Sequence, residues 1–189
     1  MAGNLSRIDF SDNEYTVKQK AVRNAYKIFD SSGNEVLRTK QKLFKMKEEF
    51  PFTDPEGNDV FSVKAEQVMD FAGDYALTDS ETGKKIAILK KDFTFFIHSW
   101  QIHDHNDIKI ASIKSRGKLF GALRTLSDMA NLLPHKYTIQ NQNGEQIGRI
   151  KQSFTLLRDK YKIKIKENNI ENKEAILAAA ITIDALEGN

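Results

Sequence analysis

The feature that most constrains the fold is a C-terminal stretch that is apolar on every side. Residues 175 to 186 read Ala-Ile-Leu-Ala-Ala-Ala-Ile-Thr-Ile-Asp-Ala-Leu, and Asp184 is the one charged residue among them. As a helix this stretch is about 18 Å long, well short of the roughly 30 Å hydrocarbon core of a membrane. A helix without a polar face must be enclosed by the protein. We therefore expect a buried helix over about residues 173–187, after Asn172 as its N-cap, and the axis of a β-barrel is one good place for it.

Most of the remaining chain has the pattern of β-strands. Residues alternate in Tyr161–Lys166, so that Tyr161, Ile163 and Ile165 share one face and three lysines share the other. Further stretches rich in β-branched or aromatic residues are also expected to be strands: residues 15–20, 85–89, 93–100 and 108–114.

A hairpin pattern recurs three times, in Tyr26–Val36, Tyr75–Ile86 and Tyr137–Ile147. Each copy has an aromatic residue, an aliphatic residue, Asp or Asn, a polar turn with glycine, and an aliphatic strand. Asp or Asn caps such a turn through its side chain, and glycine adopts the positive φ that closes it. Asp54–Asp59 supplies a fourth turn of similar chemistry. Repeated hairpins favour a meander that closes into a barrel or a sandwich, because closure removes exposed strand edges.

Composition limits the class of protein and its chemistry. The chain has 189 residues and no cysteine, which excludes disulfides, thiol nucleophiles and iron–sulfur clusters. This length suits one domain, so we expect residues 1–189 to form a single unit. The first residues lack the apolar stretch of a secretory signal peptide, and with the missing cysteines this leads us to expect a cytoplasmic protein.

Taken in order, these segments resemble the LURP-one-related family. The resemblance rests on the three tyrosine hairpins, the Phe-containing strand ending in Ser99-Trp100, and Tyr161–Ile165 before the final helix. It implies the tubby C-terminal-like fold shared with phospholipid scramblases, in which twelve antiparallel strands close around a central C-terminal helix. Tubby-like relatives bind phosphoinositides and dock on membranes. No phosphoinositide-binding motif matches this sequence residue by residue, and no family site residue is carried over.

Basic residues concentrate near the C-terminus. Residues 149–166 hold seven basic side chains against Asp159 alone, a local charge of +6 that leaves −3 for the rest of the +3 chain. A row of cations on one strand face is a candidate site for anionic lipid headgroups. The candidate residues are Arg158, Lys160, Lys162, Lys164 and Lys166. The simpler interpretation, which we favour, is a solvated lysine row that also protects a strand edge. Nucleic acid is not expected as a partner, because Tyr161 points inward and leaves no stacking aromatic on this face.

The segment His98–Asp107 is a second candidate. It contains three of the four histidines, and His103, His105 and Asp107 are the potential metal ligands. On a strand, His103 and His105 would point to the same side. The favoured interpretation is a solvated hairpin turn between Ile102 and Ile108, since the spacing matches no known metal motif.

The sequence favours a binding or scaffold domain over an enzyme. It contains no Gly-x-Ser-x-Gly elbow, phosphate-binding glycine loop or His-Glu-x-x-His pair. We therefore predict a non-enzymatic domain without a cofactor, whose ligand is an anionic lipid surface or a protein. The alternatives are a small-molecule or metal-dependent enzyme with its site near His98–Asp107, and a protein that assembles with itself through exposed strands.

Overall fold

The structure is a computed structural model of the chain, and it describes residues 8–19, 25–40, 49–66, 74–94, 97–115, 136–155, 158–166 and 172–187. Twelve strands and one helix lie in these ranges. They are β1 Glu14–Gln19, β2 Ala25–Phe29, β3 Glu35–Lys40, β4 Glu49–Thr53, β5 Asp59–Ala65, β6 Asp74–Asp79, β7 Lys85–Thr94, β8 Ile97–His103, β9 Lys109–Ser115, β10 Lys136–Asn141, β11 Gln146–Thr155, β12 Arg158–Ile165 and α2 Lys173–Glu187.

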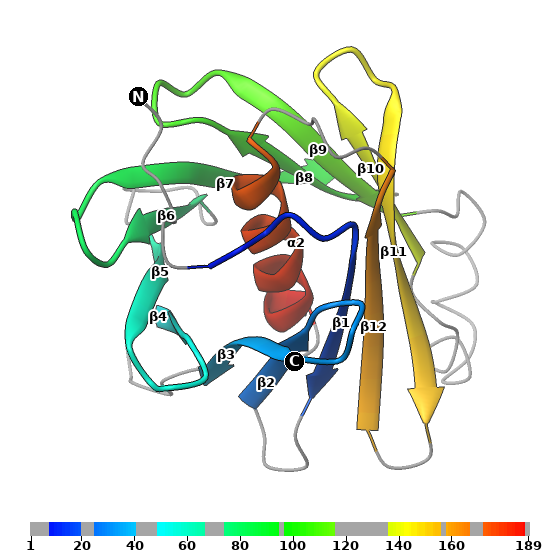
Figure 1. Cartoon of the computed structure of the whole chain (residues 1–189). Helices are drawn as coiled ribbons and strands as arrows, with labels where there is room; N and C mark the ends of the chain where they lie inside the picture. The colour runs from blue at the N-terminus through cyan, green and yellow to red at the C-terminus, as the bar shows by residue number, and fades with distance from the viewer. Residues whose placement is uncertain are drawn as a thin grey trace.

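The strands form a closed antiparallel barrel. Each strand pairs with its neighbours in chain order, and β1 pairs with β12 to close the ring, with Val17 opposite Tyr161 (Figure 1). The sequence left a barrel and a sandwich open, and the structure is the barrel that the family resemblance implied. Because each of the twelve described strands is paired on both sides, this ring offers no strand edge for self-assembly.

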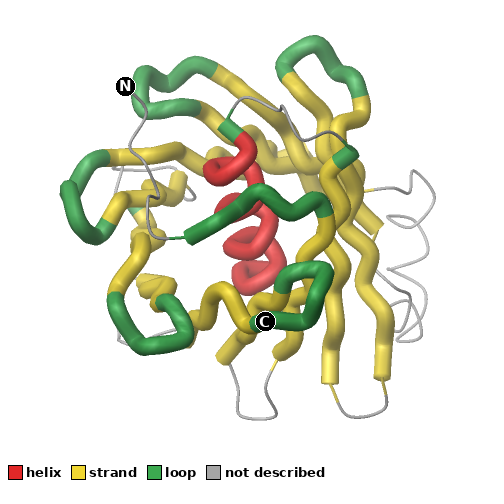
Figure 2. The backbone as a smooth tube through the Cα atoms, viewed as in Figure 1, coloured by secondary structure: helices red, strands yellow, loops and turns green. Residues whose placement is uncertain are grey.

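Helix α2 lies inside the ring, as Figure 2 shows. The side chains of Ala175–Ile181 and Ile183 are at most 4% exposed, and the helix lies against β6, β7 and β8. The inward-facing residues of the strands join these side chains in one hydrophobic cluster that includes Trp100, Leu177 and Ile163. The prediction of an enclosed helix over residues 173–187 is confirmed. The Asp184 side chain lies outside the described residues.

The start of α2 is fastened to the segment before β1. The helix begins directly after Asn172, whose carbonyl accepts a hydrogen bond from the Ile176 amide. Lys173 is only 4% exposed, and its ammonium group donates to the Ser11 carbonyl (2.9 Å) and to Asn13 Oδ1 (3.2 Å). The neighbouring segment, residues 8–13, passes in front of α2 in Figure 1 and buries Phe10 in the core.

The predicted hairpin turns are confirmed. The Asn34 amide donates to Asp30 Oδ1 at 2.8 Å, and the Glu145 amide donates to Asn141 Oδ1 at 2.9 Å. The nearby turn glycines, Gly33 and Gly144, have φ of 89° and 82°, which side-chain-bearing residues rarely adopt.

Two predictions in the Phe93–Ile108 region need correction. The expected single strand over residues 93–100 is wrong, because the chain reverses between β7 and β8 with Thr94 opposite Ile97. The aromatic sequence there contains no Gly, Pro, Asn or Asp at the reversal to indicate a turn. His103 and His105 also do not share a strand face, because β8 ends at His103 and His105 lies in the following turn.

Candidate functional site

The lysine row of β12 faces outward, as its alternation predicts. Tyr161, Ile163 and Ile165 are buried, whereas the Lys162 and Lys164 side chains are 48% and 47% exposed. The Tyr161 hydroxyl turns into the barrel and accepts a hydrogen bond from Gln152 Nε2 at 2.9 Å. No aromatic ring of β12 therefore joins the outer lysines, in agreement with the sequence interpretation.

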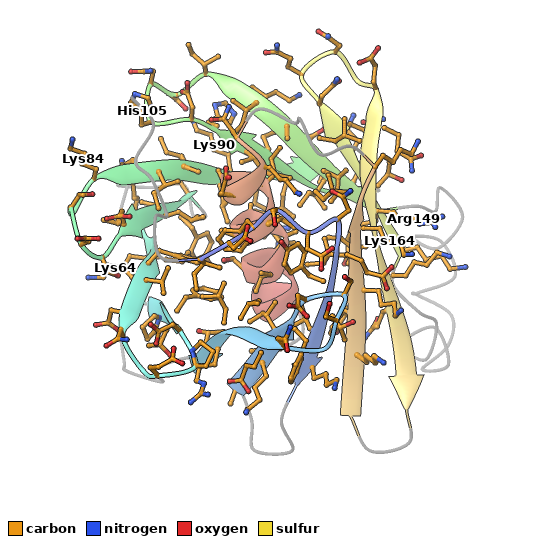
Figure 3. The ribbon with its side chains drawn as sticks, in the orientation of Figure 1. Lys64, Lys84, Lys90, His105, Arg149 and Lys164 are labelled. Atoms are coloured by element: carbon orange, nitrogen blue, oxygen red, sulfur yellow. The ribbon has the colours of Figure 1, made fainter. Side chains whose placement is uncertain are left out.

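The strand register extends this row into a wide basic face. Lys151 of β11 stands directly opposite Lys162 on one side and Lys136 of β10 on the other. Arg149 stands opposite Lys164, and Figure 3 shows both side chains on the outside of the barrel. On the other side of β12, Lys18 of β1 stands opposite Lys160. We define the basic face by its outward cations: Lys18, Lys114, Lys136, Arg149, Lys151, Lys160, Lys162, Lys164 and Lys166.

This register contradicts one part of the simpler interpretation, the protection of a strand edge, and is compatible with the other part, a solvated lysine row. Strand β12 pairs with β1 along one side and with β11 along the other, so it is not an edge strand. A closed barrel has no edge that needs a charge to prevent pairing.

The basic face places like charges directly opposite each other. The cross-strand pairs are Lys136–Lys151, Lys151–Lys162, Arg149–Lys164 and Lys18–Lys160. Side chains in such positions have Cβ atoms about 5 Å apart, and like charges there destabilise a sheet. These like-charge pairs therefore do not contribute to the stability of the barrel.

Glu14 is the one acidic residue in the described outward positions of β1, β12, β11 and β10. Its Oε1 accepts a hydrogen bond from Lys162 Nζ at 2.7 Å, and its Oε2 forms an ion pair with Lys164. The Lys162 ammonium, and then that of Lys164, hold the pKa of Glu14 below its usual value, although burial acts in the opposite direction. Glu14 is therefore ionised at neutral pH and neutralises part of the β12 charge.

The structure brings most of the predicted cations together and adds others. Lys160, Lys162 and Lys164 lie on β12, Lys166 follows its end, and the Arg158 side chain lies outside the described residues. Sequence reasoning missed the part played by Lys18, Lys114 and Lys136. Alternation with the inward Tyr137 could have identified Lys136, whereas Lys18 depends on the pairing of β1 with β12, which no local pattern reveals.

Within the His98–Asp107 segment, the residues up to His103 belong to β8, and those from Asp104 onward form the predicted turn to β9. Asp104 Oδ1 accepts hydrogen bonds from the Asn106 and Ile108 amides, at 2.9 and 2.8 Å. Asp107 has a positive φ of 66°, the conformation that glycine adopts in the other turns.

The potential metal ligands of this turn have protein partners. His103 Nδ1 lies 2.9 Å from Asp107 Oδ1, and Lys90 Nζ lies 2.7 Å from the same carboxyl oxygen. The Lys90 ammonium, with a smaller contribution from His103, holds the pKa of Asp107 below its usual value. His105 is exposed and contacts Asn106. Among the described side chains no three His, Asp or Glu residues gather as a metal site, and the His98 side chain is not among them.

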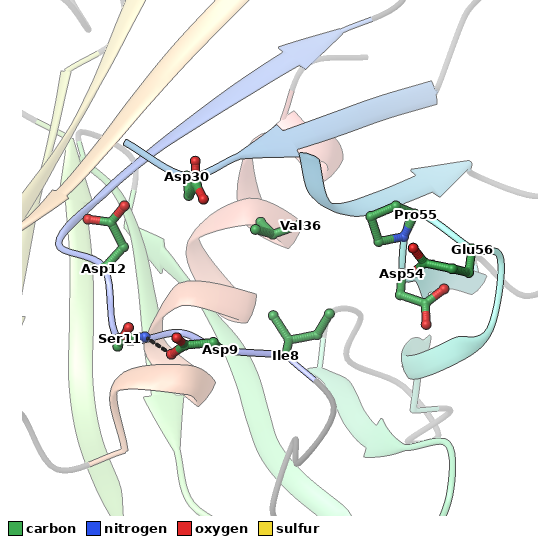
Figure 4. A pocket seen from close by; sticks show the side chains of 9 residues that line it. All are labelled: Ile8, Asp9, Ser11, Asp12, Asp30, Val36, Asp54, Pro55 and Glu56. Atoms are coloured by element: carbon green, nitrogen blue, oxygen red, sulfur yellow. Dashed lines mark hydrogen bonds between the residues drawn. The ribbon is translucent and has the colours of Figure 1, made fainter. Parts of the chain in front are cut away.

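An acidic pocket of about 520 Å³ opens beside the N-terminal segment (Figure 4). Its carboxylates serve local structure. Asp12 Oδ2 accepts a hydrogen bond from the Ser31 amide at 2.6 Å, Asp9 Oδ1 accepts one from the Ser11 amide at 2.8 Å, and Asp54 accepts two from Asn58.

Burial opposes ionisation of Asp12, but its hydrogen bonds with Ser31, Asn13 and Glu14 outweigh burial and lower its pKa. We therefore interpret Asp9 and Asp54 as caps of their own turns, and Asp12 as the group that ties the N-terminal segment to the turn between β2 and β3.

The part of the chain that the structure describes contains no helix long and apolar enough to cross a bilayer.

Comparisons with known proteins identify the family of the chain by its sequence and, separately, a solved structure with the same fold. Residues 35–184 match the family described as LURP-one-related. A solved structure described as the X-ray structure of a protein from Arabidopsis thaliana superposes with a TM-score of 0.57 over 97% of each chain, at 8% sequence identity. At that identity the likeness concerns the fold alone. No curated protein matches the chain in sequence.

Proposed function

The chain belongs to the LURP-one-related family, and from that premise we propose that it is a non-enzymatic binding domain whose basic face docks on membranes rich in anionic lipid. The observation that carries the proposal is the register of β10, β11, β12 and β1, which places like-charged side chains opposite one another. Such an arrangement costs stability in the free protein, and an anionic surface next to it would reduce that cost. The site thus has the charge of a surface that binds anions.

A lipid surface fits this face better than a small anion does. Its cations spread over five neighbouring strands, from Lys18 on β1 to Lys114 on β9, and do not converge on a cavity. Each Lys or Arg near an acidic leaflet contributes on the order of 1 kcal/mol to binding. The cytoplasmic leaflet carries most of the anionic lipid. We therefore also propose a cytoplasmic location. We further propose that residues 1–189 form a single domain and that its barrel is of the tubby and scramblase type.

Sedimentation with vesicles tests this function. We expect the chain to sediment with vesicles of three parts phosphatidylcholine to one part phosphatidylserine, and not with phosphatidylcholine alone. Binding should weaken as salt rises from about 0.1 M to about 1 M, because the Debye length falls from about 10 Å to about 3 Å.

A matched pair of variants locates the binding face. Arg149→Glu with Lys151→Glu should reduce vesicle binding at least about tenfold. Lys64→Glu with Lys84→Glu makes the same charge change across the barrel, where Figure 3 places both residues, and should leave most of the binding. Equal losses from the two variants, or no sedimentation of the wild-type chain, would contradict the proposal. A chain that shows no charge-dependent binding to lipid vesicles but does bind an acidic protein would indicate that the face serves a protein partner instead.

A further inference from the structure

Ion pairing divides the basic face into two unequal halves. This division determines which cations are available to a lipid phosphate. The inference drawn from it rests on the function proposed above. The half on β12 and β1 contains an acidic residue, whereas the half on β10 and β11 contains none among the described outward positions.

In the β12 half, the carboxylate of Glu14 forms ion pairs with two lysines. Both oxygens of Glu14 are engaged, one with Lys162 at 2.7 Å and the other with Lys164. The Glu14 side chain is 24% exposed, and Glu14 on β1 stands directly opposite Lys164 on β12. The three groups together carry a net charge of +1. A phosphate that approached these lysines would have to displace Glu14 or lie next to its negative charge.

In the β11 half, the cations have no such counter-ion. Lys136, Arg149 and Lys151 are exposed, and none of them forms an ion pair within the described part of the chain. Together they carry +3. Lys136 and Lys151 are direct cross-strand neighbours, and Arg149 projects from the same face of β11 two residues before Lys151.

The spacing suits a phosphate group. Directly opposed residues on a sheet lie about 5 Å apart, and residues two apart on one strand lie about 7 Å apart. Flexible side chains at these positions reach a common oxyanion. The guanidinium of Arg149 adds a planar pair of donors that matches two phosphate oxygens, which a lysine does not offer.

We propose that Lys136, Arg149 and Lys151 form the primary phosphate subsite of the basic face, and that Glu14 excludes Lys162 and Lys164 from it. Lys162 and Lys164, which belong to the lysine row most evident in the sequence, are therefore at the periphery of the site. The ligand is the phosphate group of an anionic phospholipid.

Two variants with the same change in net charge test this subsite. Lys151→Gln removes one charge from the proposed subsite. The triple variant Glu14→Gln, Lys162→Gln, Lys164→Gln removes the whole ion-paired group and also lowers the net charge by one. With vesicles of three parts phosphatidylcholine to one part phosphatidylserine, we expect Lys151→Gln to weaken binding about 5-fold and the triple variant less than about 2-fold.

The outcomes separate this inference from the function on which it rests. An equal or larger loss for the triple variant overturns the subsite but leaves lipid binding in place. Absence of wild-type binding overturns the function itself. Arg149→Lys keeps the charge and removes the planar donors, so it should also weaken binding, and full binding by this variant would contradict a role for the guanidinium. Circular dichroism of each variant checks that it folds, which we expect because all the substituted side chains lie on the outside.

Discussion

Two rows of side chains cross β10, β11, β12 and β1 one residue apart, and they have opposite chemistry. The inner row is Tyr137, Ile150, Ile163 and Tyr15, each at most 7% exposed. The outer row is Lys136, Lys151, Lys162 and Thr16, on the same strands and in the same register. A slip of one residue would exchange the two rows, so the apolar row fixes the register and carries the basic row with it.

The difference between the rows separates folding from function. The inner row and α2 bury apolar surface, which is the main source of stability in a small domain. The outer row contributes like-charge pairs that act against stability. Substitutions inside should therefore affect unfolding, and substitutions outside should affect binding. The following predictions test that separation, from the largest expected effect to the smallest.

The largest effect is expected inside the barrel. Leu177 on α2 is fully buried, so Leu177→Ala should leave a cavity and lower the free energy of unfolding by about 2–5 kcal/mol. Urea unfolding followed by circular dichroism measures this change. Lys166→Ala on the exterior should stay within about 0.5 kcal/mol of wild type. A similar small change for Leu177→Ala would mean that the helix is not tightly packed in the ring.

A smaller loss is expected where two strands approach closely. A Cβ atom at Gly148 would lie 2.6 Å from the Lys164 carbonyl oxygen and 3.2 Å from Ile139 Cδ1. Gly148→Ala should therefore push β11 away from β12 and cost about 1–3 kcal/mol. Gly144→Ala provides a comparison, because nothing lies within 4 Å of that position and only its positive φ opposes a side chain. We expect about 1 kcal/mol there and a larger loss at Gly148, so an equal cost at both sites would show that β11 can shift freely.

Acid should loosen the junction between the N-terminal segment and the barrel. The pKa values of Asp12 and Glu14 are lower in the folded protein than their usual values, so the folded state favours their ionised forms. Their contribution to stability is present above the unfolded pKa and is lost as pH falls through the folded pKa. Urea midpoints measured from neutral pH to below about pH 4 should fall, and the fall should be smaller in Asp12→Asn. The same acid dependence in that variant would assign the effect to other carboxyl groups.

The smallest effect has the opposite sign. Lys151→Glu replaces two like-charge pairs with opposite-charge pairs, to Lys136 and to Lys162. We expect the urea midpoint to rise by the equivalent of a few tenths of a kcal/mol, up to about 1 kcal/mol. High salt should reduce this gain. A lower midpoint would show that the lysines are compatible with one another in the free protein.

Local patterns in the sequence were enough to predict the buried helix and the inward-facing side chains of the strands. The unbroken apolar run around Leu177 required an enclosure, and the alternation at Tyr161 assigned each side chain of β12 to a face. The Asp and Asn turn caps were predicted because their hydrogen bonds reach only four residues along the chain.

The basic face on the outside of the barrel could not be predicted in full, because it depends on contacts between residues far apart in the sequence. Glu14 meets Lys162 across 148 residues, and only the closure of the barrel brings them together. The turn at Asp107 was predicted from its polar residues, although an aspartate there holds the positive φ that glycine holds elsewhere. The reversal between β7 and β8 was missed because its sequence lacks turn residues.

The most direct test measures stability and binding on one variant, Arg149→Glu with Lys151→Glu. Our central claim is that the inner face of these strands makes the fold and the outer face meets anionic lipid. We predict an unfolding midpoint equal to or above that of wild type, together with loss of binding to phosphatidylserine vesicles. Vesicle binding at the wild-type level in the folded variant would contradict the claim, and so would a large drop in the midpoint.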